Sequence, residues 1–259
     1  MRKAVRTFLK YGVDTIKLNL SGDNFVPHAD AKTTWMSDEE VAMAVRETKL
    51  RGKRNTVHAR SQDSIQQALR HGIEVLYHVS YTDEQTLDML EAQKNRIFIV
   101  PTFSVLVKLA YDGAPYGSTR GSLMQRNMEE ELEACSASMR ALHKRGLRIL
   151  PGGDYGFAWA VHGENATDLQ YLVKYAGMTP MEAIVAATRL GGEIMMQPNE
   201  LGLVKEGYLA DLLLVDGDPL ANIALLQEPS RLLAVMKNGV FHKEPEIRSA
   251  RSLRPASVA

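Results

Sequence analysis

Four polar residues, Lys17, His58, His78 and Asp154, each stand in or at the end of a short run of β-favouring residues. Two neutral imidazoles and a carboxylate are ligands that a divalent metal such as zinc prefers. Such a metal lowers the pKa of a bound water to about 7, which produces hydroxide at neutral pH. A lysine ammonium would be repelled by the ion, so Lys17 suits the site only when it is deprotonated or converted to an anion.

Each of these residues also has a plain structural explanation. A histidine at a strand end is more often a satisfied structural residue, a strand lysine is more often ion-paired or reaching for solvent, and an aspartate after two glycines is more often a turn former. Their coincidence favours function, because active sites of βα barrels are built at the carboxyl ends of several strands.

The chain alternates short β-rich runs with longer helical patterns, which indicates an α/β fold with a parallel sheet. Five strands are predicted at 13–20, 55–59, 74–79, 96–103 and 147–154. Helices are expected to begin at Ser37, near Ser61, near Thr82 and near residue 125. Ser37 with Glu40 three positions on forms the signature of a capping box.

The last third of the sequence changes character. Helical patterns at 165–176 and 180–195 precede short strands at 212–216 and 234–240, which suggest a separate small β layer. We therefore divide the chain into a main domain at 1–200, the β layer at 201–243 and a flexible tail at 244–259. The glycine-rich stretch at 112–121 reads as a mobile loop.

Composition excludes several classes of protein. The 259 residues include 31 Lys and Arg against 31 Asp and Glu, so no basic excess is available for nucleic acid. The apolar runs are shorter than the roughly 18 residues that a membrane span needs, and the opening MRKAVRTFLKYGVD lacks the apolar stretch of an export signal. The lone Cys135 fits a reducing compartment, so we expect a cytoplasmic protein.

The sequence resembles the amidohydrolase superfamily of metal-dependent hydrolases. It is most similar to the imidazolonepropionase-like branch, with its prolidase-like (Xaa-Pro dipeptidase) and ochratoxin-hydrolysing members. The matching segments are TIKLNLSG, VHAR, HGIEVLYHVSYTDEQTLDMLE, LPGGDYGFAW, GMTPMEAIVAATRLGGE, and GLVKEGYLADLLLVDGDPL with VMKNGV. The resemblance covers about residues 13–241. It implies the last five units of a (β/α)8 TIM-type barrel, followed by the remnant of a small β-sandwich.

The resemblance also implies a chemistry. Lys17 would be carbamylated and bridge two metal ions, with zinc as the expected metal; His58 and His78 would ligate one ion, and Asp154 would bind the other and shuttle a proton. The expected reaction is hydrolysis of an amide or peptide bond in a small substrate, such as a Xaa-Pro dipeptide or an N-acyl amino acid.

The sequence departs from the family pattern in one respect that matters for this site. The superfamily has an HxH pair at the end of its first barrel strand, and no HxH occurs in this sequence. Only five of eight βα units are present, so the chain resembles the C-terminal portion of a longer enzyme. The alternative to a complete enzyme is therefore a catalytically incomplete fragment that needs a missing N-terminal segment or a companion chain. We also expect a homo-oligomer.

Three further residues are candidates for substrate binding. Arg60 and Tyr77 suit recognition of a substrate carboxylate, since arginine offers two parallel donors and tyrosine a hydroxyl; the alternative for both is capping and packing. His162 resembles a position near the substrate in the family, and otherwise is a loop histidine. Tyr155, Phe157 and Trp159 are candidates for an apolar pocket wall. A metal-free, phosphate-binding barrel is a weaker hypothesis, supported only by the partial match of PGGDYG to a phosphate loop.

Overall fold

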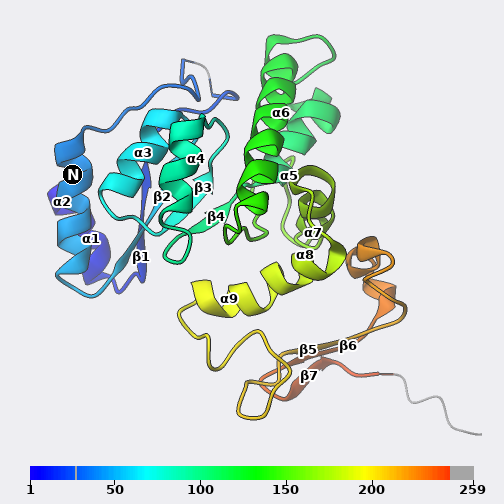
Figure 1. Ribbon diagram of the computed structural model, residues 1–259. Coiled ribbons are helices and arrows are strands. Elements are labelled where there is room, and N and C mark those ends of the chain that lie inside the picture. The colour runs from blue at the N-terminus through cyan, green and yellow to red at the C-terminus, as the bar shows by residue number, and fades with distance from the viewer. Residues whose placement is uncertain (27, 246–259) are drawn as a thin grey trace, which may run out of the picture.

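The N-terminal part of the chain forms a four-stranded parallel sheet, in the order β1-β2-β3-β4 (Figure 1). The computed structural model describes residues 1–26 and 28–245. The strands are β1 (Thr15–Asn19), β2 (Arg54–Ala59), β3 (Val75–His78) and β4 (Phe98–Val100). The predicted α/β class with a parallel sheet is confirmed.

Helices follow the strands, as the sequence patterns predict. They are α2 (Asp38–Lys49), α3 (Gln62–Arg70), α4 (Glu84–Glu91) and the long α6 (Leu123–Lys144). Each begins after a residue whose side-chain oxygen accepts a backbone N–H of the first turn, namely Ser37, Ser61, Asp83 and Ser122. The capping box of Ser37 and Glu40 is present in both directions. These caps satisfy donors that have no partner inside the helix, which is why the helix starts were readable from sequence.

The fifth predicted strand, 147–154, is wrong as a strand. It contributes a single parallel bridge between Ile149 and Ile99. Ile99 donates to Arg148 and accepts from Leu150, both at 2.9 Å, and the pairing ends there. Pro151 then follows without an N–H to donate. The segment still brings Asp154 near Tyr77 of β3, since its carboxylate adds to burial in raising the pKa of that tyrosine.

An N-terminal helix, α1 (Arg2–Lys10), packs beside α2 (Figure 1). Its Val5 is buried. Arg6 Nε donates to Glu47 of α2 at 2.9 Å, and Arg51 Nη1 reaches the same carboxylate at 2.9 Å. The opening segment is therefore a folded element of the domain.

Outside residues 145–166, most of the chain between β4 and residue 195 is helical, and one prediction is corrected here. It forms α5 (Phe103–Val107), η1 (Lys108–Asp112), η2 (Ala114–Tyr116), α7 (Thr167–Tyr171), η3 (Leu172–Ala176), α8 (Pro180–Ala187) and α9 (Arg189–Ile194). The helix predicted at 180–195 is thus broken at Thr188, against whose carbonyl the backbone of Gly202 packs. The stretch 112–121 includes a short 3-10 turn, and Tyr116 donates to the Ala158 carbonyl at 2.9 Å.

The C-terminal layer is a three-stranded antiparallel sheet, ordered β5-β6-β7. Its strands are β5 (Leu212–Val215), β6 (Leu232–Lys237) and β7 (Val240–Lys243). The strand predicted at 234–240 is therefore two strands, joined by Asn238 and Gly239, both with positive φ as a tight hairpin turn requires. The predicted tail at 244–259 falls, beyond Pro245, outside the described residues.

The small sheet leaves apolar side chains open to solvent. Leu213 and Leu214 of β5 are 57% and 51% exposed, and Phe241 of β7 is 44% exposed. Among the residues that the structure describes, no helix combines the length and apolar character needed to cross a membrane.

Candidate metal centre

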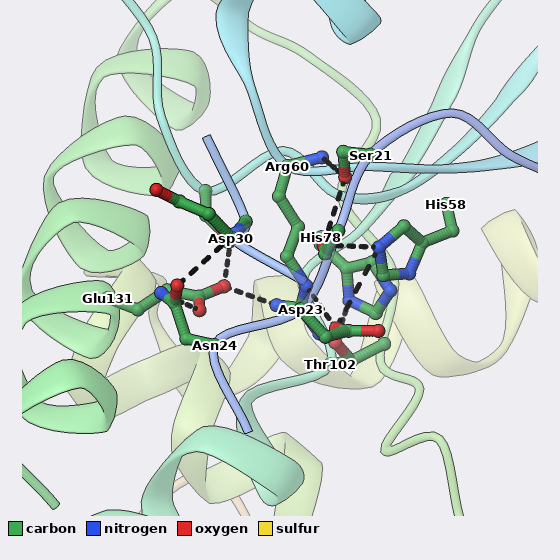
Figure 2. Close-up of polar contacts among 12 residues, drawn as sticks. Ser21, Asp23, Asn24, Asp30, His58, Arg60, His78, Thr102 and Glu131 are labelled. Atoms are coloured by element: carbon green, nitrogen blue, oxygen red, sulfur yellow. Dashed lines mark hydrogen bonds and ion pairs between the residues drawn. The ribbon is translucent and has the colours of Figure 1, made fainter. Parts of the chain in front are cut away.

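Two histidines from neighbouring strands meet at the carboxyl edge of the parallel sheet. His58 lies in β2 and His78 ends β3, and the register pairs His78 with Ala59. Their ring centroids lie 4.4 Å apart, with the ring planes at 70° (Figure 2). Both side chains are buried, His78 completely. Parallel strands end at one edge of a sheet, and this placement brings the two predicted ligands together.

A backbone carbonyl fixes the tautomer of His58. The ring Nε2 lies 3.0 Å from the Gly22 carbonyl oxygen. A carbonyl only accepts, so Nε2 must carry the proton. The lone pair of a neutral His58 therefore lies on Nδ1.

Thr102, which follows β4, fixes the opposite tautomer of His78. Its hydroxyl donates to the Pro101 carbonyl at 2.7 Å and lies 2.5 Å from His78 Nδ1. Since the hydroxyl proton is already committed, the threonine oxygen accepts from Nδ1–H. The lone pair of His78 then lies on Nε2, which is buried and has no hydrogen-bond partner. Orphaned buried polar atoms are uncommon in native proteins and point to a missing ligand.

Four residues near these groups adopt backbone conformations that are unfavourable for residues other than glycine. His78, Val79, Thr102 and Asp154 all have positive φ, at 75°, 51°, 56° and 53°. For residues other than glycine such conformations cost about 1–3 kcal/mol each and cluster at functional sites. All four occur within or just after the ends of the sheet segments, so the strain is concentrated at this edge.

Burial and charge keep both imidazoles neutral. Burial lowers the pKa of His58 and, well below its ordinary value, that of His78. The Arg60 guanidinium lowers both pKa values further. A neutral ring offers a lone pair, which is the form that ligates metals.

Lys17, Tyr77 and Asp154 lie around the same edge. Lys17 Nζ is 4.9 Å from the Tyr77 ring centroid, and that ring lies 6.3 Å from His78. After burial and Arg60, the Lys17 charge also lowers the pKa of both histidines. Burial raises the pKa of Tyr77, and the Asp154 carboxylate raises it further. The structure therefore gathers these three predicted residues within electrostatic range of one another or of the histidine pair.

The described residues fit a divalent metal as a partial donor set. The set comprises Nδ1 of His58 and Nε2 of His78, and the orphaned Nε2 is the observation that supports the fit. Across residues 1–26 and 28–245, no group of three or more His, Cys, Asp and Glu side chains is arranged to hold a metal ion. A structural or catalytic zinc takes at least three protein ligands, so this set needs further donors.

Arg60 is buried and pairs with carboxylates inside the protein, and its guanidinium does not face an open pocket. Its side chain is 1% exposed; Nε donates to Asp23 at 2.7 Å, and Nη1 pairs with Glu131 of α6. The guanidinium is thus committed to two carboxylates. This geometry matches the packing alternative for Arg60, whose donors are used inside the protein.

Three residues of this region were missed by sequence reasoning: Asp23, Thr102 and Glu131. Glu131 could have been predicted from the sequence pattern, because it shares the inward face of α6 with the buried Met128, Leu132 and Cys135. A carboxylate on an apolar helix face demands a buried partner. Asp23 and Thr102 lie in loops and carry no comparable pattern.

His162 lies on the loop after Asp154 and is exposed. A Cβ on Gly156 would come 3.5 Å from its Nε2, which places His162 beside residue 156. The structure does not bring it into contact with the two buried histidines, and its substrate role stays a prediction.

An aromatic cluster joins the loop after β1 to the loop after Asp154. The rings of Phe157 and Trp159 are stacked at 4.9 Å, and Phe25 meets both edge-on at 5.8 and 6.0 Å. Tyr116 lies 5.5 Å from Trp159. Tyr155 instead donates to the buried Asp168 at 2.9 Å. Phe157 and Trp159 thus form a shared apolar surface, whereas Tyr155 has a packing role.

A cavity of about 840 Å³ opens between the loop after β1 and the start of α6. Phe25, Trp35 and Tyr81 line it, and Asp23 forms part of its wall. The Asp23 carboxylate lies 3.8 Å from His58 Nε2, so this wall adjoins the histidine pair.

Fold and site together define a class of protein. A parallel α/β sheet that gathers two neutral imidazoles, an amine and a carboxylate near one edge is typical of hydrolases built on βα units. Residues 2–241 match the model of the Amidohydrolase family, and the chain belongs to that family.

Individual relatives agree with this assignment. The chain is 29% identical to ochratoxinase from Aspergillus niger over 249 residues, which are 95% of this chain and 50% of the relative. The crystal structure of A. niger ochratoxinase has a TM-score of 0.82, with 95% of this chain and 54% of that chain covered. A Xaa-Pro dipeptidase with methionine bound in its active site has 26% identity and a TM-score of 0.81, covering 93% and 57%. The chain thus spans about half the length of the relatives it matches.

Proposed function

We propose that this chain carries part of the centre of a metal-dependent amidohydrolase that cleaves an amide or peptide bond. The observation that carries the proposal is the buried pair of His58 and His78, with lone pairs left free on Nδ1 and Nε2. The expected substrates are Xaa-Pro dipeptides or N-acyl amino acids, by likeness to the relatives above. When bound, a divalent metal such as zinc would polarise the substrate carbonyl and acidify the attacking water.

The residues of this chain have distinct proposed roles. His58, His78 and Lys17, the last as a carbamate formed from its amine and carbon dioxide, would hold the metal. Asp154 would take a proton from the attacking water as the C–O bond forms, and would return it to the leaving amine as the amide C–N bond then breaks. Tyr77, half-buried between Lys17 and His78, would donate its hydroxyl to a substrate carboxylate.

A second proposal is that the isolated chain is catalytically incomplete. Two imidazoles do not make a full ligand set, and the chain spans about half of its relatives. A companion polypeptide or an N-terminal segment supplying an HxH pair would complete the site. The completed fold would be a (β/α)8 barrel with a small β-sandwich. We also expect the chain to form a homo-oligomer, which light scattering would measure.

One experiment separates these possibilities. The purified chain is titrated with zinc by calorimetry, and then assayed with zinc on Xaa-Pro dipeptides and N-acyl amino acids, with His78→Ala as control. One weakly bound ion without hydrolysis supports the incomplete centre, and hydrolysis that His78→Ala abolishes supports the complete enzyme. Binding that is equal in His78→Ala would overturn both, and tight binding of two ions by the isolated chain would overturn the incomplete centre.

A further inference from the structure

Two successive ion pairs link helix α6 to the loop of residues 21–23, whose Gly22 carbonyl contacts the His58 ring (Figure 2). Glu131 of α6 pairs with Arg60 Nη1, and Arg60 Nε donates to Asp23 at 2.7 Å. Glu131 is fully buried and Arg60 is 1% exposed. Three sections of sequence, spaced widely along the chain, are joined by this one guanidinium.

The loop of residues 21–23 is fixed by three successive contacts to β2 and the residue after it. Ser21 Oγ accepts the Arg60 backbone N–H at 2.9 Å, the Gly22 carbonyl accepts His58 Nε2–H at 3.0 Å, and Asp23 accepts from Arg60 as above. The contact that sets the His58 tautomer is therefore the middle one of three. The two outer contacts both involve Arg60.

The Glu131 carboxylate accepts hydrogen bonds from three side chains. Besides Arg60, its carboxylate accepts from Ser80 Oγ and from Asn24 Nδ2, each at 2.8 Å. A buried ion pair of this kind is often no more stabilising than apolar residues of the same volume. Hydrogen bonds from behind a metal-ligating histidine, in contrast, set its tautomer and orientation.

We propose that Glu131, Arg60 and Asp23 act as positioning residues for His58. Through the loop at 21–23 they hold the Gly22 carbonyl where it accepts Nε2–H, so that Nδ1 keeps the free lone pair. The metal-binding side of this inference rests on the proposed function; the positioning of His58 does not. Helix α6 is thereby coupled to a predicted ligand from which it is far removed in sequence.

The test reads the tautomer of His58 in the metal-free chain. Two-bond ¹H–¹⁵N spectra distinguish a protonated Nε2 from a protonated Nδ1. We expect wild-type His58 to be protonated on Nε2 and Glu131→Gln to show exchange between the two tautomers. Glu47→Gln is the matched control, because Glu47 is another buried carboxylate paired with arginines, 3% exposed and part of α2. That control should keep the wild-type His58 spectrum.

Asp23→Asn is a second variant. It should fold more readily than Glu131→Gln, because the Asp23 side chain is 21% exposed whereas that of Glu131 is fully buried. It should show the same tautomer exchange and bind zinc about 10- to 100-fold more weakly than wild type, the usual effect of losing such support. A wild-type His58 spectrum in folded Asp23→Asn overturns the inference, even if zinc binding and hydrolysis are observed. Tautomer exchange in a chain that binds no zinc would leave the positioning role intact and remove the proposed function.

Discussion

Thr102 Oγ1 accepts a hydrogen bond from His78 Nδ1–H while donating one to the Pro101 carbonyl, so a residue after β4 decides which nitrogen of a β3 histidine is free. The β3–β4 pairing brings the two residues to the same edge of the sheet. His58 is held by the opposite nitrogen. The two rings therefore offer different atoms, Nδ1 and Nε2, although both are neutral histidines at the ends of adjacent strands.

Replacing Thr102 by valine should weaken zinc binding at the histidine pair by about 10- to 100-fold, because the support behind His78 is lost. Calorimetric titration of the purified chain measures the effect. Thr48→Val is a suitable control, since Thr48 is equally buried and its hydroxyl bonds to Val45 of α2 and Asn55 of β2 but to neither histidine. Equal loss of zinc affinity in both variants would show that the effect is general destabilisation.

Replacing Asp154 by asparagine should leave zinc binding by His58 and His78 within about twofold, because Asp154 is not one of the two ring donors. In any preparation that hydrolyses substrate, kcat should fall by about 100- to 10,000-fold, the usual contribution of a positioned acid or base. Steady-state kinetics on Xaa-Pro dipeptides checks the second point. Unchanged kcat would remove Asp154 from the proposed proton transfer.

Glu47 should make the fold sensitive to acid. Hydrogen bonds from Arg6, and secondarily from Arg51, lower the pKa of Glu47 from 4.5 to about 2 against the opposing effect of burial. Since the folded pKa lies below the unfolded one, the stabilisation is complete above about pH 4.5 and disappears as the pH falls through about 2.

Thermal unfolding followed by circular dichroism checks the acid prediction. The difference in Tm between wild type and Glu47→Gln should be largest near neutral pH and shrink steadily below about pH 4.5. A difference that is independent of pH would mean that the Glu47 charge does not contribute.

Gly22→Ala should destabilise the chain by about 1–3 kcal/mol, as overpacking commonly does. A Cβ at residue 22 would come 2.4 Å from the Asp30 carbonyl oxygen and 2.7 Å from that of Ala29. Urea unfolding measures the change. Gly191→Ala is the control: nothing lies within 4 Å of its added Cβ inside α9, so stability should rise by about 0.5–1 kcal/mol.

Local signals explain which parts of the fold could be predicted. The capping box of Ser37 and Glu40 lies within four residues and is present as expected. The errors at 147–154, 180–195 and 234–240 arose where such patterns continue past a break. Pro151, the close packing of Gly202 on Thr188, and the turn at Asn238 and Gly239 interrupt them.

The sequence by itself determined the family and the placement of Lys17, His58 and His78 on neighbouring strands, because the side-chain alternation that marks a strand is a local property. Tertiary structure decided how the two histidines present their nitrogens. It also decided that Arg60 faces Glu131, 71 residues away, instead of an open pocket. These outcomes depend on which distant donors and acceptors meet once the sheet and α6 pack together, and no pattern within one segment encodes that.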